Sequence, residues 1–163
     1  MKVKPIKYLL ILPVVLVMVM IFVFSSEDAT KSSETSGRVV NFIIELINKD
    51  YDKMEENEKE EYYNKVSFIV RKLAHFSIFA LLSFFMIIMF SSIILKYHIF
   101  RISLLTFSIS SLYAMSDEIH QFYTSGRAME VRDLLIDMAG IVFGIMFFML
   151  IRLLFKNKKN KEV

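Results

Sequence analysis

The 163-residue chain is 55% apolar by its content of Ala, Val, Ile, Leu, Met, Phe, Trp, Tyr and Cys, and its mean hydropathy is +0.50. It has no cysteine, which excludes a disulfide framework and a thiolate metal site. Long apolar blocks alternate with charged stretches, which excludes a disordered tail and a simple cytosolic enzyme. The net charge of +3 says little until the distribution of the charges along the chain is considered.

Four apolar segments are long enough to cross a bilayer, whose hydrocarbon core of about 30 Å needs roughly 20 apolar residues in a helix. They cover approximately residues 6–24, 73–95, 99–122 and 134–155. The sequence therefore predicts an all-α integral membrane protein, a four-transmembrane-helix bundle that forms a single domain over residues 1–163. A secretory signal is the alternative interpretation of the first segment, but no A-x-A cleavage pattern follows Phe24.

The loop over residues 25–72 is predicted to be helical as well. Apolar residues recur in it at helical spacing, namely Val39, Val40, Ile43, Ile44 and Ile47. This pattern predicts an amphipathic helix that lies on the outer membrane surface or against the bundle. The acidic run from Glu55 to Glu61 is interpreted as a solvated helical face.

The charges of the connections predict the orientation. Basic residues dominate the two ends of the chain and the 96–101 connection, where Glu162 is the single acid. The 25–72 loop and the 117–137 region are acidic overall. Because Lys and Arg are enriched in cytoplasmic loops, both termini are predicted to be cytoplasmic and the 25–72 loop extracytoplasmic.

The ionisable residues of three different spans fall into one layer. Measured from the basic residues at the inner ends of the spans, His75, His120 and Asp133 lie about 31, 28 and 28 Å outward, at about 1.5 Å per helical residue. That depth corresponds to the outer edge of the hydrocarbon core. Charged groups at such depth usually face the bundle interior and pair with one another.

The candidate ligand-binding residues of this layer are Arg71, Lys72, His75, Asp117, Glu118, Gln121, Arg127, Asp133 and Asp137. The candidate acid–base residues are His75, Asp117, Glu118 and His120. Three interpretations stay open: an ion-pair network that only fixes helix packing, a pocket for a polar ligand, and a divalent metal site. The metal site would use His75, His120 and the carboxylates, but neither an H-x-x-x-H nor an H-E-x-x-H pattern supports it, so it is the weakest of the three interpretations. No cofactor is expected.

A small-residue pattern lies in the fourth span, where Gly140 and Gly144 are four residues apart and Ala139 is beside them. In lipid, such residues allow two helix backbones to approach closely. We therefore expect this span to pack tightly against a neighbour.

Several motifs taken together resemble the VanZ-like family. Residues 70–76, which read VRKLAHF, resemble its R-K-x-A-H-F motif. Residues 117–122, followed by Gly126-Arg127, Asp133, Asp137 and Gly140, are similar to its D-E-x-x-Q-x-F, G-R and D-x-x-x-N-x-x-G block. Phe24-Ser25-Ser26 is similar to the serine-rich exit from its first span, with Ser33 and Ser36 downstream. Asp137 departs from the family, which usually has Asn there.

The resemblance implies a multi-pass protein of the bacterial plasma membrane. The family is named for a member that gives low-level teicoplanin resistance. It implies a role in lipoglycopeptide resistance or cell-envelope maintenance, with a lipoglycopeptide or a lipid-linked cell-wall precursor bound at the outer leaflet. Arg71, Lys72 and Arg127 would hold phosphate or carboxylate groups. The alternative is an intramembrane enzyme acting on a lipid-linked substrate, with His75 or His120 as general base or acid. The expected partner is the lipid bilayer, and no nucleic acid is expected.

Overall fold

The computed structural model describes residues 5–26, 29–94, 98–124 and 130–161. In these ranges the chain forms helices and no strand. The elements are η1 (Pro5–Leu10), α1 (Ile11–Ser25), α2 (Ala29–Ile47), η2 (Tyr51–Lys53), α3 (Glu56–Ile93), α4 (Ile99–Phe122) and α5 (Val131–Lys161). The predicted all-α architecture is therefore confirmed.

Four helices are long and apolar enough to cross a membrane, over Tyr8–Ser25, Glu56–Ile93, Ile99–Phe122 and Val131–Lys156. Their outward side chains are largely apolar, as those of Leu12, Leu104 and Phe147 illustrate. A helix satisfies its backbone hydrogen bonds internally, which lipid requires of any spanning segment. The described chain is thus a multi-pass helical membrane protein, as the four apolar segments predicted.

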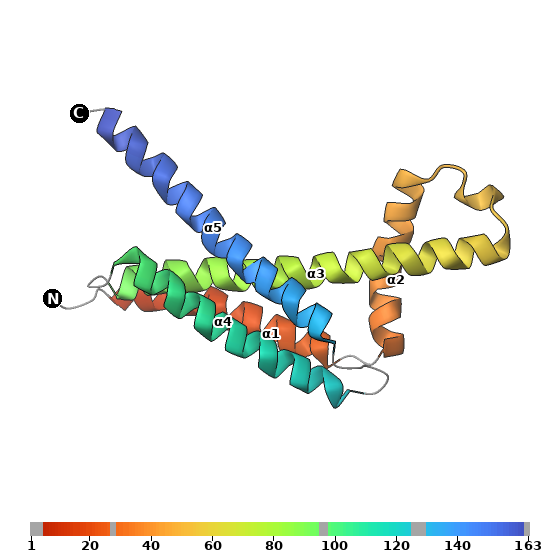
Figure 1. The fold of residues 1–163 in the computed structure, drawn as a ribbon, viewed down its shortest axis with the longest axis horizontal. Coiled ribbons are helices and arrows are strands. Elements are labelled where there is room, and N and C mark those ends of the chain that lie inside the picture. The colour runs from red at the N-terminus through yellow and green to blue at the C-terminus, as the bar shows by residue number, and fades with distance from the viewer. Residues whose placement is uncertain (1–4, 27–28, 95–97, 125–129, 162–163) are drawn as a thin grey trace.

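The helices are organised around α3, which contacts α1, α2, α4 and α5 and has its most extensive contact with α5 (Figure 1). α1 and α4 lie along one side of α3, while α5 crosses α3 obliquely. The start of η1 and the C-terminal part of α5 lie toward the same end of the molecule, as an even number of spans requires. The assignment of that end to the cytoplasm stays a prediction.

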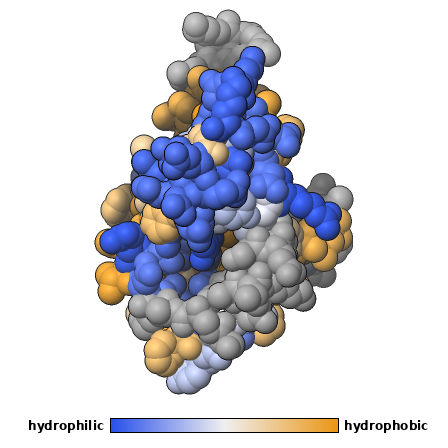
Figure 2. All heavy atoms as spheres, turned by 90° about the vertical axis from the view of Figure 1, so that its right-hand side faces the viewer, coloured by the Kyte–Doolittle hydropathy of each residue, from blue (hydrophilic) through white to orange (hydrophobic). Residues whose placement is uncertain are grey.

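α3 begins well before the span that the sequence predicts from residue 73. A capping box starts the helix, in which the side chains of Glu55 and Glu58 each accept a hydrogen bond from the other residue's backbone N–H. From there α3 runs for 38 residues without interruption, which corresponds to about 57 Å. Since the hydrocarbon core is only about 30 Å thick, the acidic part of α3 projects beyond the bundle (Figure 1). Viewed from that end, the molecule shows hydrophilic side chains at the centre and hydrophobic ones at the flanks (Figure 2).

α2 is the amphipathic helix expected in the 25–72 loop. It packs against α3 through Val40 and Ile44, which are fully buried, while Val39 and Phe42 are exposed. One face of α2 is therefore buried against α3, and another face is exposed.

The small-residue pattern of the fourth span produces the tightest helix contact. A Cβ atom added at Gly140 would collide with the backbone oxygen of Phe76, and one at Gly144 would collide with that of Ala80. Ser83 Oγ lies 3.0 Å from the backbone oxygen of Ile141 and donates to it across the same contact. The expected close approach is confirmed, and the partner is α3.

Candidate functional site

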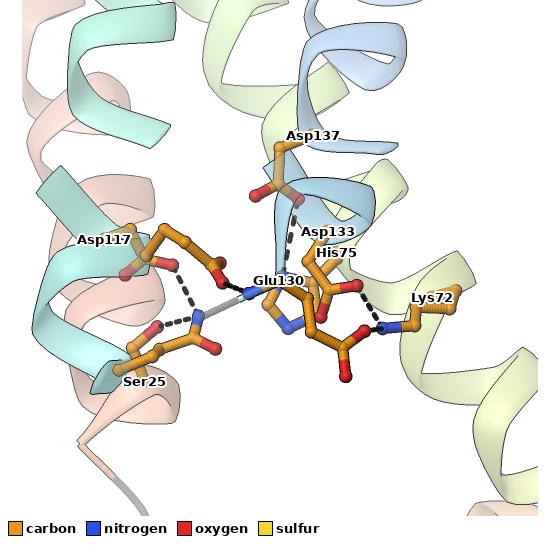
Figure 3. Close-up of polar contacts among 9 residues, drawn as sticks. Ser25, Lys72, His75, Asp117, Glu130, Asp133 and Asp137 are labelled. Atoms are coloured by element: carbon orange, nitrogen blue, oxygen red, sulfur yellow. Dashed lines mark hydrogen bonds and ion pairs between the residues drawn. The ribbon is translucent and has the colours of Figure 1, made fainter. Parts of the chain in front are cut away.

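The polar residues that the sequence places at one depth come together at one end of the bundle (Figure 3). Lys72 and His75 project from α3, three residues apart and so on one face of that helix. Asp117 and Glu118 come from α4, and both are buried. Asp137 comes from α5 and is 0% exposed. Three spans thus contribute to one cluster.

One half of the cluster joins α3 to the start of α5. Lys72 Nζ forms an ion pair and a hydrogen bond with Asp133 Oδ1, and it lies 3.9 Å from Glu130 Oε2. One turn further along both helices, His75 Nδ1 lies 3.4 Å from Asp137 Oδ1. This second contact is close enough for an ion pair with a protonated His75, but neither atom has a hydrogen-bond partner among the described residues.

The other half joins α4 to the end of α1. Gln121 Nε2 donates to Asp117 Oδ2 at 2.8 Å and to Ser25 Oγ at 3.3 Å. His120 Nε2 lies 3.0 Å from Ser26 Oγ, and the imidazole stacks on the Phe22 ring with the centroids 4.7 Å apart. These contacts bring α1 into the site, which the depth calculation for the other three spans did not include.

Glu118 connects the two halves. Its Oε1 accepts a hydrogen bond of 2.6 Å from the backbone N–H of Glu130, the residue that precedes α5. Its Oε2 is buried and has no hydrogen-bond partner among the described residues, and the same is true of both oxygens of Asp137. The centre of the cluster therefore holds buried carboxyl oxygens with unused acceptor capacity.

Not every predicted site residue joins this cluster. Arg71 is exposed and forms no ion pair with the part of the chain that the structure describes. Arg127 lies outside the described residues, so its predicted role is neither supported nor contradicted by these contacts. Within the described ranges, the cluster contains more carboxyl groups than basic side chains. The basic side chains are Lys72, His75 and His120, and the carboxyl groups are those of Asp117, Glu118, Glu130, Asp133 and Asp137.

Three contributors were absent from the predicted set, namely Ser25, Ser26 and Glu130. The two serines had a signal, because the Phe24-Ser25-Ser26 stretch follows the first span in the manner of the VanZ-like family. Glu130 had none, because its contribution to Glu118 is a backbone N–H that every residue except proline carries. The 3.9 Å contact of its side chain with Lys72 joins segments far apart in the sequence.

No group of three or more His, Asp and Glu side chains in the described ranges has the arrangement to hold a metal ion. The Ser26–His120 pair has the distance of a nucleophile and its base, but Ser26 Oγ also donates to the backbone oxygen of Phe22 at 2.7 Å. A hydroxyl that bonds to the carbonyl four residues earlier is common in membrane helices without any catalytic role.

Fold and cluster together define a class, the multi-pass helical membrane protein whose spans carry a buried polar cluster at one end. The model of the VanZ/LLP1 family matches residues 10–152, which include all the residues of that cluster, and the chain belongs to this family. Neither the comparison with curated proteins nor the comparison with solved structures gave a match.

Proposed function

We propose that this protein binds a polar or lipid-linked ligand of the cell envelope at the outer leaflet of the bacterial plasma membrane. The observation that carries the proposal is the Asp137 carboxyl group, which is fully buried and has neither oxygen in a hydrogen bond within the described chain, although Oδ1 lies 3.4 Å from His75 Nδ1. Burying an unsatisfied polar group costs free energy, and ionisable residues inside membranes usually serve a function. A ligand that donates to this group would offset the cost.

The chemistry of the site defines what the ligand must offer. The free acceptors on Asp137 and Glu118 require hydrogen-bond donors, which hydroxyl and amine groups supply. Lys72 is already paired with Asp133, and Arg71 is exposed and does not join the cluster, so Arg127 is the remaining predicted candidate for a phosphate or carboxylate of the ligand. Lipoglycopeptides and lipid-linked cell-wall precursors combine such donors with anionic groups. This match, together with family membership, supports a role in teicoplanin resistance or cell-envelope maintenance.

The proposal is tested by teicoplanin susceptibility in a host that lacks this protein. We expect the wild type to raise tolerance, and Asp137→Ala and Arg127→Ala to abolish the gain, because each removes a ligand contact. Arg132→Ala is the matched control, since Arg132 lies on the first turn of α5 and is exposed. A C-terminal tag measures the abundance of each variant in the membrane. Wild type without any effect on tolerance would refute the resistance role, and tolerance unchanged in both site variants would refute the site.

Catalysis on a lipid-linked substrate is the second candidate, and the 3.0 Å contact between Ser26 Oγ and His120 Nε2 favours it. The two candidates differ in what they demand of His120. A binding site tolerates His120→Gln, because glutamine can still bond to Ser26, whereas an enzyme that uses the imidazole as a base does not. Loss of tolerance in His120→Gln at normal abundance would therefore favour the enzyme.

A further inference from the structure

α2 carries apolar side chains on two of its faces. With about 100° between successive residues, Val40 and Ile44 share one face, which is buried against α3. Val39, Phe42 and Leu46 share the neighbouring face, and they are 50%, 60% and 65% exposed. We call these three residues the α2 apolar flank. Nothing in the described part of the chain covers them.

The side of α2 beyond the α3 contact is polar. Arg38, Asn41 and Glu45 lie there, and all three are exposed. The contact with α3 therefore has the α2 apolar flank on one side and a polar flank on the other. A helix that needed only to pack on α3 and meet water would gain nothing from the apolar flank, because exposing it to water is unfavourable.

The position of α2 relative to the spans indicates what surrounds the α2 apolar flank. α2 lies across α3 rather than along it (Figure 1). It begins at Ala29, only four residues after Ser25 in the polar cluster, so its start lies within about 14 Å of that serine. If α3 runs along the membrane normal, α2 lies in the membrane plane at the outer edge of the bilayer.

The surface of α3 between the cluster and α2 is itself suited to lipid. Ile69 and Leu73 are 48% and 58% exposed, and they lie on the N-terminal side of His75 in α3. The apolar surface of the bundle therefore continues outward beyond the polar cluster, toward the level of α2.

We propose that α2 is an interfacial helix whose apolar flank lies among the lipids of the outer leaflet. Val39, Phe42 and Leu46 would enter the boundary between headgroups and acyl chains, to a depth of about 5–10 Å for helices of this kind. Arg38, Asn41 and Glu45 face water. The contact with α3 ties this depth to the polar cluster and so holds the cluster at the level of the headgroups. The proposal does not depend on ligand binding.

The absence of tryptophan from the chain makes the proposal directly measurable. Phe42→Trp and Leu46→Trp each place a single indole on the α2 apolar flank, and Asn41→Trp places one on the polar flank as the matched control. The full-length variants are reconstituted into phosphatidylcholine–phosphatidylglycerol vesicles, and circular dichroism checks their helix content. Tryptophan emission is then recorded with aqueous iodide, and separately with lipids brominated near the headgroup or near the chain terminus.

We expect Phe42→Trp and Leu46→Trp to emit at shorter wavelength than Asn41→Trp. Bromine near the headgroup should quench them more strongly than bromine near the chain terminus, whereas iodide should quench Asn41→Trp most. Equal emission and equal iodide quenching in all three variants would overturn the proposal, because the flank would then face water. Shielding of both flank variants from iodide and from brominated lipid would overturn it too, because protein, such as a second copy of this chain, would cover the flank. None of these outcomes depends on whether teicoplanin tolerance changes.

Discussion

Lys72 and Asp133 form an ion pair that is largely withdrawn from solvent, with side chains 14% and 16% exposed. Lys72 Nζ also lies 4.9 Å from the centroid of the Phe68 ring. A buried pair contributes little relative to an apolar replacement, but the loss of one partner leaves an uncompensated charge. Removal of either Lys72 or Asp133 is therefore expected to destabilise the fold as well as to change the charge of the cluster.

We predict that Lys72→Met or Asp133→Leu alone lowers the free energy of unfolding by about 3–5 kcal/mol, because each strands the other charge. The double variant should lose less than the sum of the two single losses. Chemical denaturation of the purified protein in mixed micelles measures all three.

The exposed pair of Lys53 and Asp50 is the matched control, with side chains 80% and 76% exposed. Breaking that pair should change the free energy of unfolding by about 0–1 kcal/mol, because water screens its charges. The structural importance of the buried pair would be contradicted if the losses of Lys72→Met and Asp133→Leu simply added in the double variant. It would also be contradicted if each single loss were as small as that of the control.

At the scale of the elements, the contact between α3 and α5 depends on two glycines. Gly140→Ala and Gly144→Ala each insert a methyl group where the backbone oxygen of Phe76 or Ala80 lies. We predict that each lowers the free energy of unfolding by about 1–3 kcal/mol, as overpacking typically does. Unfolding curves of the purified variants provide the measurement.

Gly37→Ala is the matched substitution in α2. A Cβ atom there would meet only Tyr63 Oη, at 3.1 Å, and a phenol at the end of its side chain can move aside. Alanine also favours the helix over glycine by about 1 kcal/mol. We expect this variant to be as stable as the wild type or more so. Equal losses at all three glycines would show that close approach to α3 is not the cause.

At the scale of the whole molecule, orientation decides which compartment the polar cluster faces. The chain has no cysteine, so an introduced thiol is its single site for maleimide labelling. We predict that an impermeant maleimide labels Glu60→Cys on intact cells, and labels Lys156→Cys only after the membrane is permeabilised. Both positions are exposed, one near the start of α3 and the other in the last part of α5. The reverse labelling pattern would turn the cluster toward the cytoplasm and contradict the outer-leaflet site.

The sequence by itself determined the class of the protein and predicted that its polar residues share one layer. Apolar length predicts a span because hydrocarbon thickness sets one scale for every membrane helix. The same rise per residue places His75, His120 and Asp133 in one layer without any knowledge of packing. The motifs around residues 70–76 and 117–140 indicated the family that the comparison then showed.

Only the tertiary structure decided which groups pair within that layer. Helical spacing puts Lys72 and His75 on one face of α3. That spacing does not predict that Lys72 pairs with Asp133 or that His75 lies beside Asp137. That choice follows from the rotation of α5 about its own axis, which the two glycines at the α3 contact help to set. The partners of Ser25 and of the Glu130 backbone N–H could not be predicted either, because a contact between segments distant in sequence leaves no local pattern. Depth is a property of one helix, whereas pairing is a property of several helices packed together.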